Sequence, residues 1–186
     1  MPDANFQIQT QRLRLVAMTP GLLRLQTEDR AGFFEALNVA PEFSWPPELV
    51  DDSAMQWLRD RLDSDKSQTG WHFWAFIWPG SGGQPDRLVG GGGFKGPPDE
   101  NGEVEIGYSM LISFREQGLA TEAVEGLLDW ARQDDRVKRV IAKTLPHLTA
   151  SRRVLEKTGF SEAGEREEDG NKIVVYTRSL EHAQAA

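Results

Sequence analysis

Residues 103–131 read EVEIGYSMLISFREQGLATEAVEGLLDWA, and this stretch decides the fold. Its first part, 103–112, reads as a strand. Its last part, 120–131, places apolar residues at the i, i+3, i+4, i+7, i+8 and i+11 positions of an amphipathic helix. A loop around Gly118 joins the two. Because the free N–H groups and the dipole of a helix start attract anions, this strand–loop–helix order suits an anion-binding site.

The segments on either side of this stretch predict further strands. Upstream, 71–78 is apolar on both faces, as in a central strand, and 87–95 follows after a short turn. Together with 103–112 they form three consecutive strands of an antiparallel meander. Alternating residues at 12–17 predict a first strand, and three more strands are expected over 137–145, from 160 onward and over 171–180.

Helices are predicted where a capping side chain precedes apolar residues. Such starts occur at Thr19, which is followed by a proline, and at 51–53. Shorter helices are expected over 31–37 and over 149–158, the latter ending at Gly159. Strand, helix and strand over 103–145 make a βαβ unit. We find no linker, so we expect one domain over residues 1–186 with a mixed α/β (α+β) fold.

The composition excludes several classes of protein. Hydrophobic residues make up 39% of the 186 residues, which excludes a disordered chain, and the net charge of −8 disfavours a nucleic-acid partner. There is no cysteine for a disulfide or a nucleophile, and the three histidines lack metal-ligand spacing. No apolar run approaches the ~20 residues of a membrane span, and the first residues do not resemble a signal peptide. We expect a cytoplasmic protein without metal, nucleic-acid or membrane partners.

A second glycine-rich stretch competes for a ligand. Gly91, Gly93 and Gly96 match the dinucleotide-binding pattern G-x-G-x-x-G as a string. That pattern needs a helix directly after it, so that the pyrophosphate meets a helix N-terminus, but Pro97 and Pro98 follow here. We therefore interpret these glycines as small residues that let another segment pack closely.

A third segment, 149–160, reads TASRRVLEKTGF and follows the Gly118 loop by about 30 residues. With it, the chain resembles the GCN5-related N-acetyltransferase (GNAT) superfamily, in the branch of the ribosomal-protein-alanine N-acetyltransferases. The segment 105–108 resembles the family's fourth strand, and 10–15 its opening strand. Arg115, Gly118 and Ala120 match its pyrophosphate loop, and 150–160 its late helix. The similarity spans nearly the whole chain.

The resemblance implies the fold and the cofactor. It predicts a mixed, mostly antiparallel sheet of about seven strands, splayed between strands 4 and 5, with acetyl-CoA lying in the gap. The backbone of Met110 and Ile112 would pair with the pantetheine amides, the amides of 116–121 would hold the pyrophosphate, and Leu119 would cover the cofactor arm. The expected cofactor-binding residues are Met110, Leu111, Ile112, Arg115, Glu116, Gln117, Gly118, Leu119, Ala120, Thr121 and Ser151.

The chain departs from the family at one position. Members of this branch usually carry an asparagine three residues before Ser151, where it bonds the pantetheine arm. This chain has Leu148 there, and leucine makes no such hydrogen bond. One lost hydrogen bond costs on the order of 1 kcal/mol, which weakens cofactor binding without abolishing it.

Aminolysis of a thioester needs a base for the ammonium group. Glu105 is the first candidate and Glu103 the second, because both point to the same face of an extended strand as the small residues Gly107 and Ser109. Partial burial raises the pKa of a carboxylate toward a value useful for catalysis. A structural role for Glu105 stays open, as does a chain of water molecules that replaces a side-chain base.

The reaction also develops negative charge on oxygen and sulfur. A backbone N–H near Met110 or Leu111 is the natural donor to the oxyanion. Ser151 is the expected acid for the leaving thiolate, because related enzymes place a serine there; a serine that merely bonds the backbone in the first helical turn is the alternative. The other candidate proton donors are Tyr108, Tyr176 and His147.

The acceptor pocket is expected from residues 30–60 and the last two strands. Four aromatic residues would either line it or belong to the core, and four acidic residues would either attract a cationic amine or form ordinary surface. The aromatic residues are Phe33, Phe34, Phe43 and Trp45, and the acidic ones are Glu28, Asp29, Glu35 and Glu42.

We therefore expect an acetyl-CoA-dependent N-acetyltransferase that acts by direct attack of a primary amine, on a peptide N-terminus or a small molecule. A catalytically silent acyl-CoA-binding module is the alternative, which Leu148 keeps open. Transfer of a larger acyl group would need a wider pocket near 90–93 and Leu111. Because family members often dimerise, a homodimer also stays open.

Overall fold

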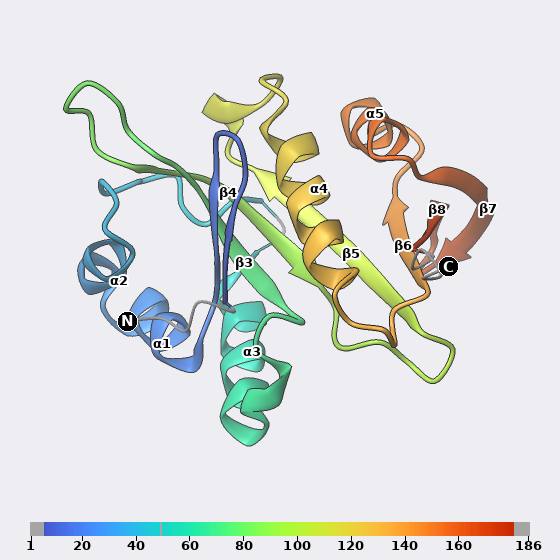
Figure 1. The fold of residues 1–186 in the computed structure, drawn as a ribbon, viewed down its shortest axis with the longest axis horizontal. Helices are drawn as coiled ribbons and strands as arrows, with labels where there is room; N and C mark the ends of the chain where they lie inside the picture. The colour runs from blue at the N-terminus through green and yellow to red at the C-terminus, as the bar shows by residue number, and fades with distance from the viewer. Residues whose placement is uncertain (1–5, 49, 181–186) are drawn as a thin grey trace, which may run out of the picture.

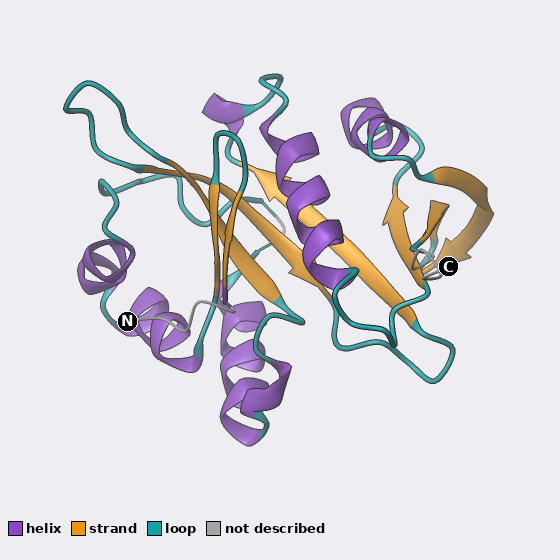
Figure 2. Cartoon of the chain, in the orientation of Figure 1, coloured by secondary structure: helices purple, strands orange, loops and turns teal. Residues whose placement is uncertain are grey.

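The computed structural model describes residues 6–48 and 50–180 and contains one open, eight-stranded sheet (Figures 1 and 2). The strand order is β1-β2-β3-β4-β5-β6-β8-β7. All neighbours are antiparallel except β5 and β6, which are parallel. The strands are β1 (Gln7–Gln9), β2 (Arg14–Ala17), β3 (Phe73–Trp78), β4 (Arg87–Phe94), β5 (Glu103–Met110), β6 (Arg139–Thr144), β7 (Ser161–Glu168) and β8 (Asn171–Ser179). The predicted mixed, mostly antiparallel sheet is confirmed.

Five α-helices flank the sheet, and both faces are covered in its first half. In Figure 1, α4 crosses in front of the sheet beside β5. It shares one core cluster with Leu155 of α5, whereas Leu23, Phe33 and Leu58 of the first three helices belong to a second cluster. The helices are α1 (Pro20–Glu28), α2 (Arg30–Leu37), α3 (Asp52–Ser64), α4 (Leu119–Ala131) and α5 (Thr149–Lys157).

The central strand β3 shows why two clusters form. Trp74 and Phe76 belong to the α4 cluster, and Ala75 and Ile77 belong to the cluster under α1–α3. All four are fully buried. Because successive side chains of a strand point to opposite faces, a strand covered on both faces is apolar throughout, as the sequence indicated.

Helices α1 and α3 begin directly after the predicted capping residues. Thr19 accepts a hydrogen bond from the N–H of Leu22 at 3.3 Å, and Asp51 accepts one from Ala54 at 2.7 Å. Gly159 lies just past α5 with φ of 77°, a conformation that suits glycine after a helix. These local signals are sufficient to place α1, α3 and α5.

Two boundaries differ from prediction. The opening segment forms two strands instead of one, because the chain turns at 10–13 between β1 and β2; this raises the strand count from about seven to eight. Strand β5 ends at Met110 because a short 3₁₀ helix, Ile112–Phe114, follows. The ends of the chain, with His182, lie outside the described residues, and the single domain over 1–186 stays a prediction.

Candidate active site

The sheet opens between β5 and β6, which are the strands that the family pattern numbers 4 and 5. Residues 103–106 of β5 pair with 139–142 of β6, but the pairing stops there, while β5 pairs with β4 up to Met110. The N–H of Leu111 donates to the carbonyl of Val89 at 2.9 Å, and alternate residues of an antiparallel strand face opposite neighbours. Tyr108 and Met110 therefore direct their backbone groups into the gap.

This register decides between the two predicted oxyanion donors. The N–H of Leu111 is bonded within the sheet, so only that of Met110 faces the gap. The carbonyl of Met110 accepts a hydrogen bond from Nε of Arg115 at 3.1 Å. Ile112, predicted to bind pantetheine, lies in the 3₁₀ helix with its side chain 70% exposed.

The loop before α4 has the properties of an anion site. Glu116 and Gly118 adopt left-handed backbone conformations, with φ of 62° and 75°, and no side chain caps the helix. Within the described residues, no N–H group from 116 to 121 donates to a protein acceptor. A Cβ on Gly118 would meet one atom, Nη2 of Arg12, at 3.4 Å. Uncapped N–H groups with open space before them suit the pyrophosphate of acetyl-CoA.

Three side chains of this loop contact other parts of the protein. Arg115 forms an ion pair with Glu48 at 2.8 Å, in addition to its bond to Met110. Gln117 donates to the carbonyl of Ser113 at 3.3 Å. The side chain of Leu119 is 1% exposed and packs in the α4 cluster.

The start of α5 borders the other side of the gap. Leu148 is its N-cap residue and forms no side-chain cap, and its side chain is 41% exposed. The hydroxyl of Tyr108 donates to the backbone carbonyl of Ser151 at 3.1 Å. The hydroxyl of Ser151 itself has no partner among the described residues, so it is free to meet a ligand.

Tyr108 and Tyr176 have different environments. Burial raises the pKa of Tyr108 to about 12, so this phenol stays protonated at neutral pH. Tyr176 is buried in the core and accepts a hydrogen bond from Nε of Arg152 at 2.9 Å, which excludes contact with the gap. His147 lies in the loop before α5. Burial lowers the pKa of His72, which is a buried residue bonded to Gln68 at 3.1 Å.

Both candidate bases form ion pairs. Glu105 contacts the ammonium groups of Lys95 and of Lys143, the latter at 3.3 Å. Glu103 contacts Arg139 at 2.6 Å. Glu103 lies in the closed part of the sheet, roughly 13 Å along the strand from Gly107, so Glu105 is the carboxylate nearer to the opening.

The face of the sheet opposite α4 and α5 has a bare position at Gly107. No atom lies within 4 Å of a Cβ built there. Glu105 and Ser109 flank it on the same face, and Phe73 lies two strands away in the same row. Gly93 lies between Phe73 and Gly107 and has no side chain, but a Cβ built there would meet the carbonyl of His72, so the open position is at Gly107 itself.

The glycines of β4 act as packing residues, as predicted. A Cβ on Gly91 would lie 2.2 Å from the ring of Phe73, and one on Gly90 would lie 2.6 Å from the carbonyl of Ser109. No helix follows them, which excludes the dinucleotide site. Neighbouring atoms lie close to Gly90–Gly93, where a larger acyl group would need a wider pocket.

The residues predicted for the acceptor pocket are mostly structural. Phe33, Phe34 and Trp45 are buried in the cluster under α1–α3, whereas Phe43 is 99% exposed. Three of the four acidic residues have protein partners. Glu28 pairs with Arg59, Asp29 caps α2 and Glu42 pairs with Arg87.

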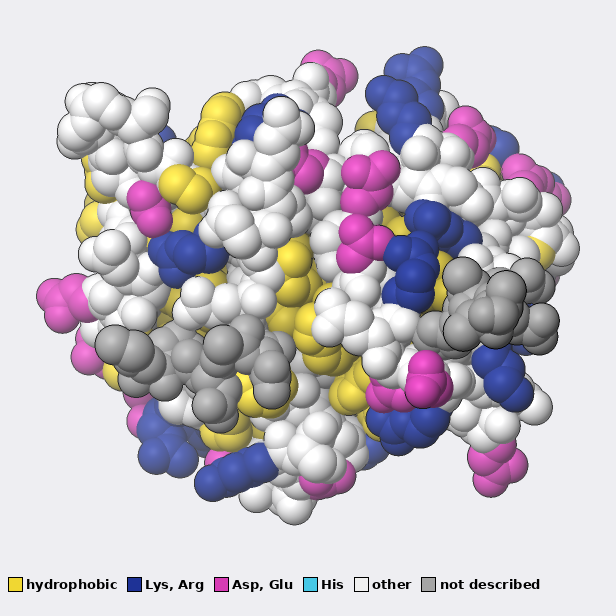
Figure 3. All heavy atoms as spheres, in the orientation of Figure 1, with side chains coloured by type: hydrophobic (Ala, Val, Ile, Leu, Met, Phe, Trp, Pro, Cys, Tyr) yellow, Lys and Arg dark blue, Asp and Glu magenta, His cyan; other side chains and the backbone are white. Residues whose placement is uncertain are grey.

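The surface offers no metal cluster in the described residues, and none of their helices is long and apolar enough to cross a bilayer. Charges of both signs are mixed over the face shown in Figure 3.

A groove of about 1070 Å³ runs between β1 and α4, away from the gap. It is lined by Phe6, Gln7, Ile8, Gln9, Thr10, Gln11, Trp71, Glu122, Glu125, Gly126, Asp129, Trp130, Gln133, Asp134 and Asp135.

Known proteins match this arrangement. Residues 21–161 match the family model of the acetyltransferase (GNAT) domain. The chain belongs to the acetyltransferase (GNAT) family. The prediction of an acetyl-CoA-dependent N-acetyltransferase is thereby confirmed at the level of the family, with acetyl-CoA as its co-substrate.

Relatives of this GNAT chain agree in sequence and in fold. The uncharacterized N-acetyltransferase YjdG of Bacillus subtilis (strain 168) is 30% identical over 82% of this chain and 88% of its own length. The ribosomal L7/L12 alpha-N-protein acetyltransferase RimL has a TM-score of 0.64 at 15% identity, covering 94% of this chain and 98% of RimL. The microcin C7 self-immunity acetyltransferase MccE, solved with acetyl-CoA and AMP, has a TM-score of 0.60 at 16% identity, with 91% and 93% coverage.

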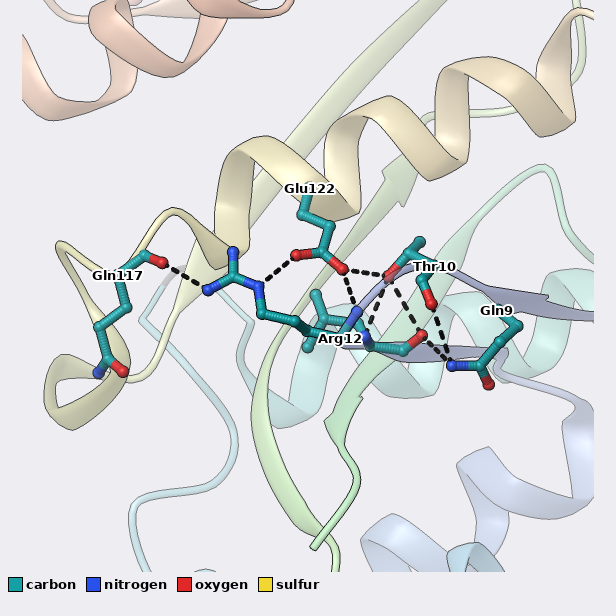
Figure 4. Close-up of polar contacts among 6 residues, drawn as sticks. Gln9, Thr10, Arg12, Gln117 and Glu122 are labelled. Carbon is teal, nitrogen blue, oxygen red and sulfur yellow. Dashed lines mark hydrogen bonds and ion pairs between the residues drawn. The ribbon is translucent and has the colours of Figure 1, made fainter. Parts of the chain in front are cut away.

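The structure also brings two unpredicted residues to the loop. Figure 4 shows Arg12, from the turn between β1 and β2, lying between the carboxylate of Glu122 on α4 and the carbonyl of Gln117. In the sequence, Arg12 stood out only as part of the opening-strand resemblance, and Glu122 was not singled out. A separation of 110 residues hides their contact.

Proposed function

We propose that this acetyltransferase transfers the acetyl group of acetyl-CoA directly to a primary amine, on a peptide N-terminus or on a small molecule. The observation that carries the proposal is the open end of β5. Tyr108 presents its backbone groups and Met110 its N–H to the gap beside α4 and α5, and the bare position of Gly107 lies on the opposite face. Acetyl-CoA bound in the gap and an amine bound over Gly107 would therefore both lie next to β5.

The residues at the gap fit acetyl-CoA. We assign the N–H groups of 116–121 to the pyrophosphate, and the backbone of Tyr108 to the pantetheine amides. When bound, acetyl-CoA supplies an activated acetyl thioester, so no side chain of the protein has to form a covalent bond to the acetyl group. The N–H of Met110 then stabilises negative charge on the acyl oxygen.

Two side chains are assigned to proton transfer. The free hydroxyl of Ser151 donates a proton to the leaving sulfur and takes one up again from solvent, while the backbone carbonyl of Ser151 accepts a hydrogen bond from Tyr108 at 3.1 Å. Glu105 accepts the proton of the amine, because it is the carboxylate two residues from Gly107 on the acceptor face. For this step Glu105 has to release one of its two lysine partners.

The test is thiol release from acetyl-CoA with a panel of amines that includes short peptides with free N-termini. Acceptor-dependent release supports the proposal and names the substrate class. The Glu105→Gln variant is then assayed between pH 6 and 9; full turnover over this range would exclude Glu105 as the base.

Binding of acetyl-CoA without release for any amine would favour the silent acyl-CoA-binding module instead. The cytoplasmic location, the homodimer and the expected lack of nucleic-acid and membrane partners stay predictions. Gel filtration of the same preparation tests the homodimer.

A further inference from the structure

The turn between β1 and β2 is bonded to the first turn of α4 (Figure 4). One carboxylate oxygen of Glu122 accepts hydrogen bonds from the backbone N–H of Arg12 at 2.5 Å and from the hydroxyl of Thr10 at 2.6 Å. Its other oxygen accepts one from Nε of Arg12 at 2.7 Å. The hydroxyl of Thr10 in turn accepts from the N–H of Leu13 at 3.0 Å. Both oxygens of Glu122 are thus used to hold the turn.

The same arginine reaches the loop that precedes α4. Nη1 of Arg12 donates to the carbonyl oxygen of Gln117 at 3.0 Å. The peptide between Gln117 and Gly118 is trans, so its C=O and N–H point in opposite directions. By holding the carbonyl on its own side, Arg12 fixes the N–H of Gly118 on the other side. A peptide turned the opposite way would present a carbonyl oxygen where an anion needs a donor.

We infer that Arg12 is a positioning residue for acetyl-CoA, which acts by orienting the Gln117–Gly118 peptide and, with Glu122 and Thr10, by fixing the pyrophosphate loop. The inference rests on the proposed function, because it takes this loop as the pyrophosphate site. None of the residues Arg12, Glu122 and Thr10 is assigned a contact with the reacting atoms.

The cluster acts through geometry more than through charge. The ion pair with Glu122 offsets the positive charge of Arg12, so the local net charge is close to zero. The side chain of Glu122 is 13% exposed and that of Arg12 40%, so salt screens this pair only in part. An arginine has several donors in a fixed planar fork and can serve Glu122 and Gln117 together, whereas a lysine offers one ammonium group.

The test compares acetyl-CoA binding by the full-length wild type, Arg12→Ala and Arg12→Lys in calorimetric titrations. We expect both variants to bind about tenfold more weakly, the factor that corresponds to one well-placed hydrogen bond. In steady-state assays the KM for acetyl-CoA should rise by a similar factor while kcat stays within about twofold, because the chemistry occurs at the other end of the cofactor.

Arg14→Ala is the matched control. Arg14 lies two residues away and also bonds a carbonyl, that of Leu37, and a carboxylate, that of Asp86, each at 3.0 Å, but it does not reach the loop. Its loss should leave acetyl-CoA affinity unchanged even if the unfolding temperature falls as much as in Arg12→Ala.

Three results would overturn the inference. The first is wild-type affinity for acetyl-CoA in Arg12→Ala. The second is wild-type affinity in Arg12→Lys, which would show that charge alone is needed. The third is an equal loss of acetyl-CoA affinity in Arg14→Ala. Each leaves the proposed function standing. Failure of the wild type to bind acetyl-CoA would instead remove the proposed function, and the inference with it.

Discussion

The N-termini of α4 and α5 border the same gap but are held differently. Both helices follow a strand of the parallel pair, and neither has a side-chain cap. The start of α4 is held by Arg12 and Thr10, which bond to Glu122 in its first turn, and the loop before it contains the left-handed residues Glu116 and Gly118. The start of α5 has an exposed leucine as its cap residue and is tied to the sheet by the bond from Tyr108.

This difference separates two ways of preparing a binding site. At α4 the protein arranges the N–H donors before any ligand arrives, which lowers the cost of ordering on binding. At α5 the residue that would complete the helix start is missing. We therefore expect cofactor affinity to depend mainly on α4, and the reaction itself to depend more on Ser151 at α5.

Gly118→Glu should have the largest effect on acetyl-CoA binding, because it disrupts the anion site at the N-terminus of α4. The φ of 75° costs a non-glycine residue about 1–2 kcal/mol, and a carboxylate at an anion site adds repulsion. We expect acetyl-CoA binding at least about 100-fold weaker in calorimetry. Gly170→Glu is the control, since Gly170 has φ of 76° and open space but lies between β7 and β8. Unchanged affinity in Gly118→Glu would remove the pyrophosphate assignment.

Ser151→Ala tests the α5 terminus. Loss of a proton donor to the thiolate should lower kcat about 100-fold, at the low end of general acid effects, with little change in acetyl-CoA affinity. Tyr108→Phe serves as comparison, because it removes the bond to the Ser151 carbonyl and leaves the serine hydroxyl. If Tyr108→Phe lowers kcat and Ser151→Ala does not, the tyrosine is the acid.

Glu122 makes the support of α4 dependent on pH. Burial raises the pKa of Glu122, but hydrogen bonds from Thr10 and Arg12 outweigh this and hold it below its usual 4.5. Its stabilising contribution is therefore complete above pH ~4.5 and is lost as the pH falls through the lowered pKa. We expect Glu122→Gln to lower the free energy of unfolding by ~1 kcal/mol at pH 7 and by less at pH 3. Denaturant titrations at both pH values measure this difference, and a constant difference would contradict it.

Leu148→Asn should have the smallest effect and make the two termini more alike. An asparagine at the cap position accepts a hydrogen bond from the first turn of α5, which raises stability by about 0.5–1 kcal/mol. We also expect acetyl-CoA to bind a few-fold more tightly, and calorimetry measures both the affinity and the unfolding temperature. Leu148→Ala removes the exposed leucine without adding an acceptor, so an equal gain there would point to the leucine itself.

Local patterns were sufficient for most of the fold. The apolar run of β3, the periodicity of α4 and the caps at Thr19 and Asp51 each reflect interactions between near neighbours in sequence. Strand β1 escaped prediction because three residues are too few to show an alternation. Its pairing with β2 becomes visible only in the folded sheet.

The site was harder to predict where it depends on register and on distant partners. Which of Met110 and Leu111 offers its N–H depends on which residues of β5 bond to β4, and a one-residue shift would reverse the answer. The lysines that pair with Glu105 come from the end of β4 and from β6, so their approach follows from the sheet order. The contact of Arg12 with α4 likewise needs the complete sheet.

The bond from Arg12 to Gln117 closes a chain loop of about a hundred residues. Contacts of such high sequence separation form late in folding, because the chain loses the entropy of loop closure before the contact stabilises the fold. During synthesis the opening turn emerges long before α4 exists. The loop before α4 thus acquires its final shape only when the first and second halves of the chain have joined, which makes acetyl-CoA binding a reporter of the completed fold.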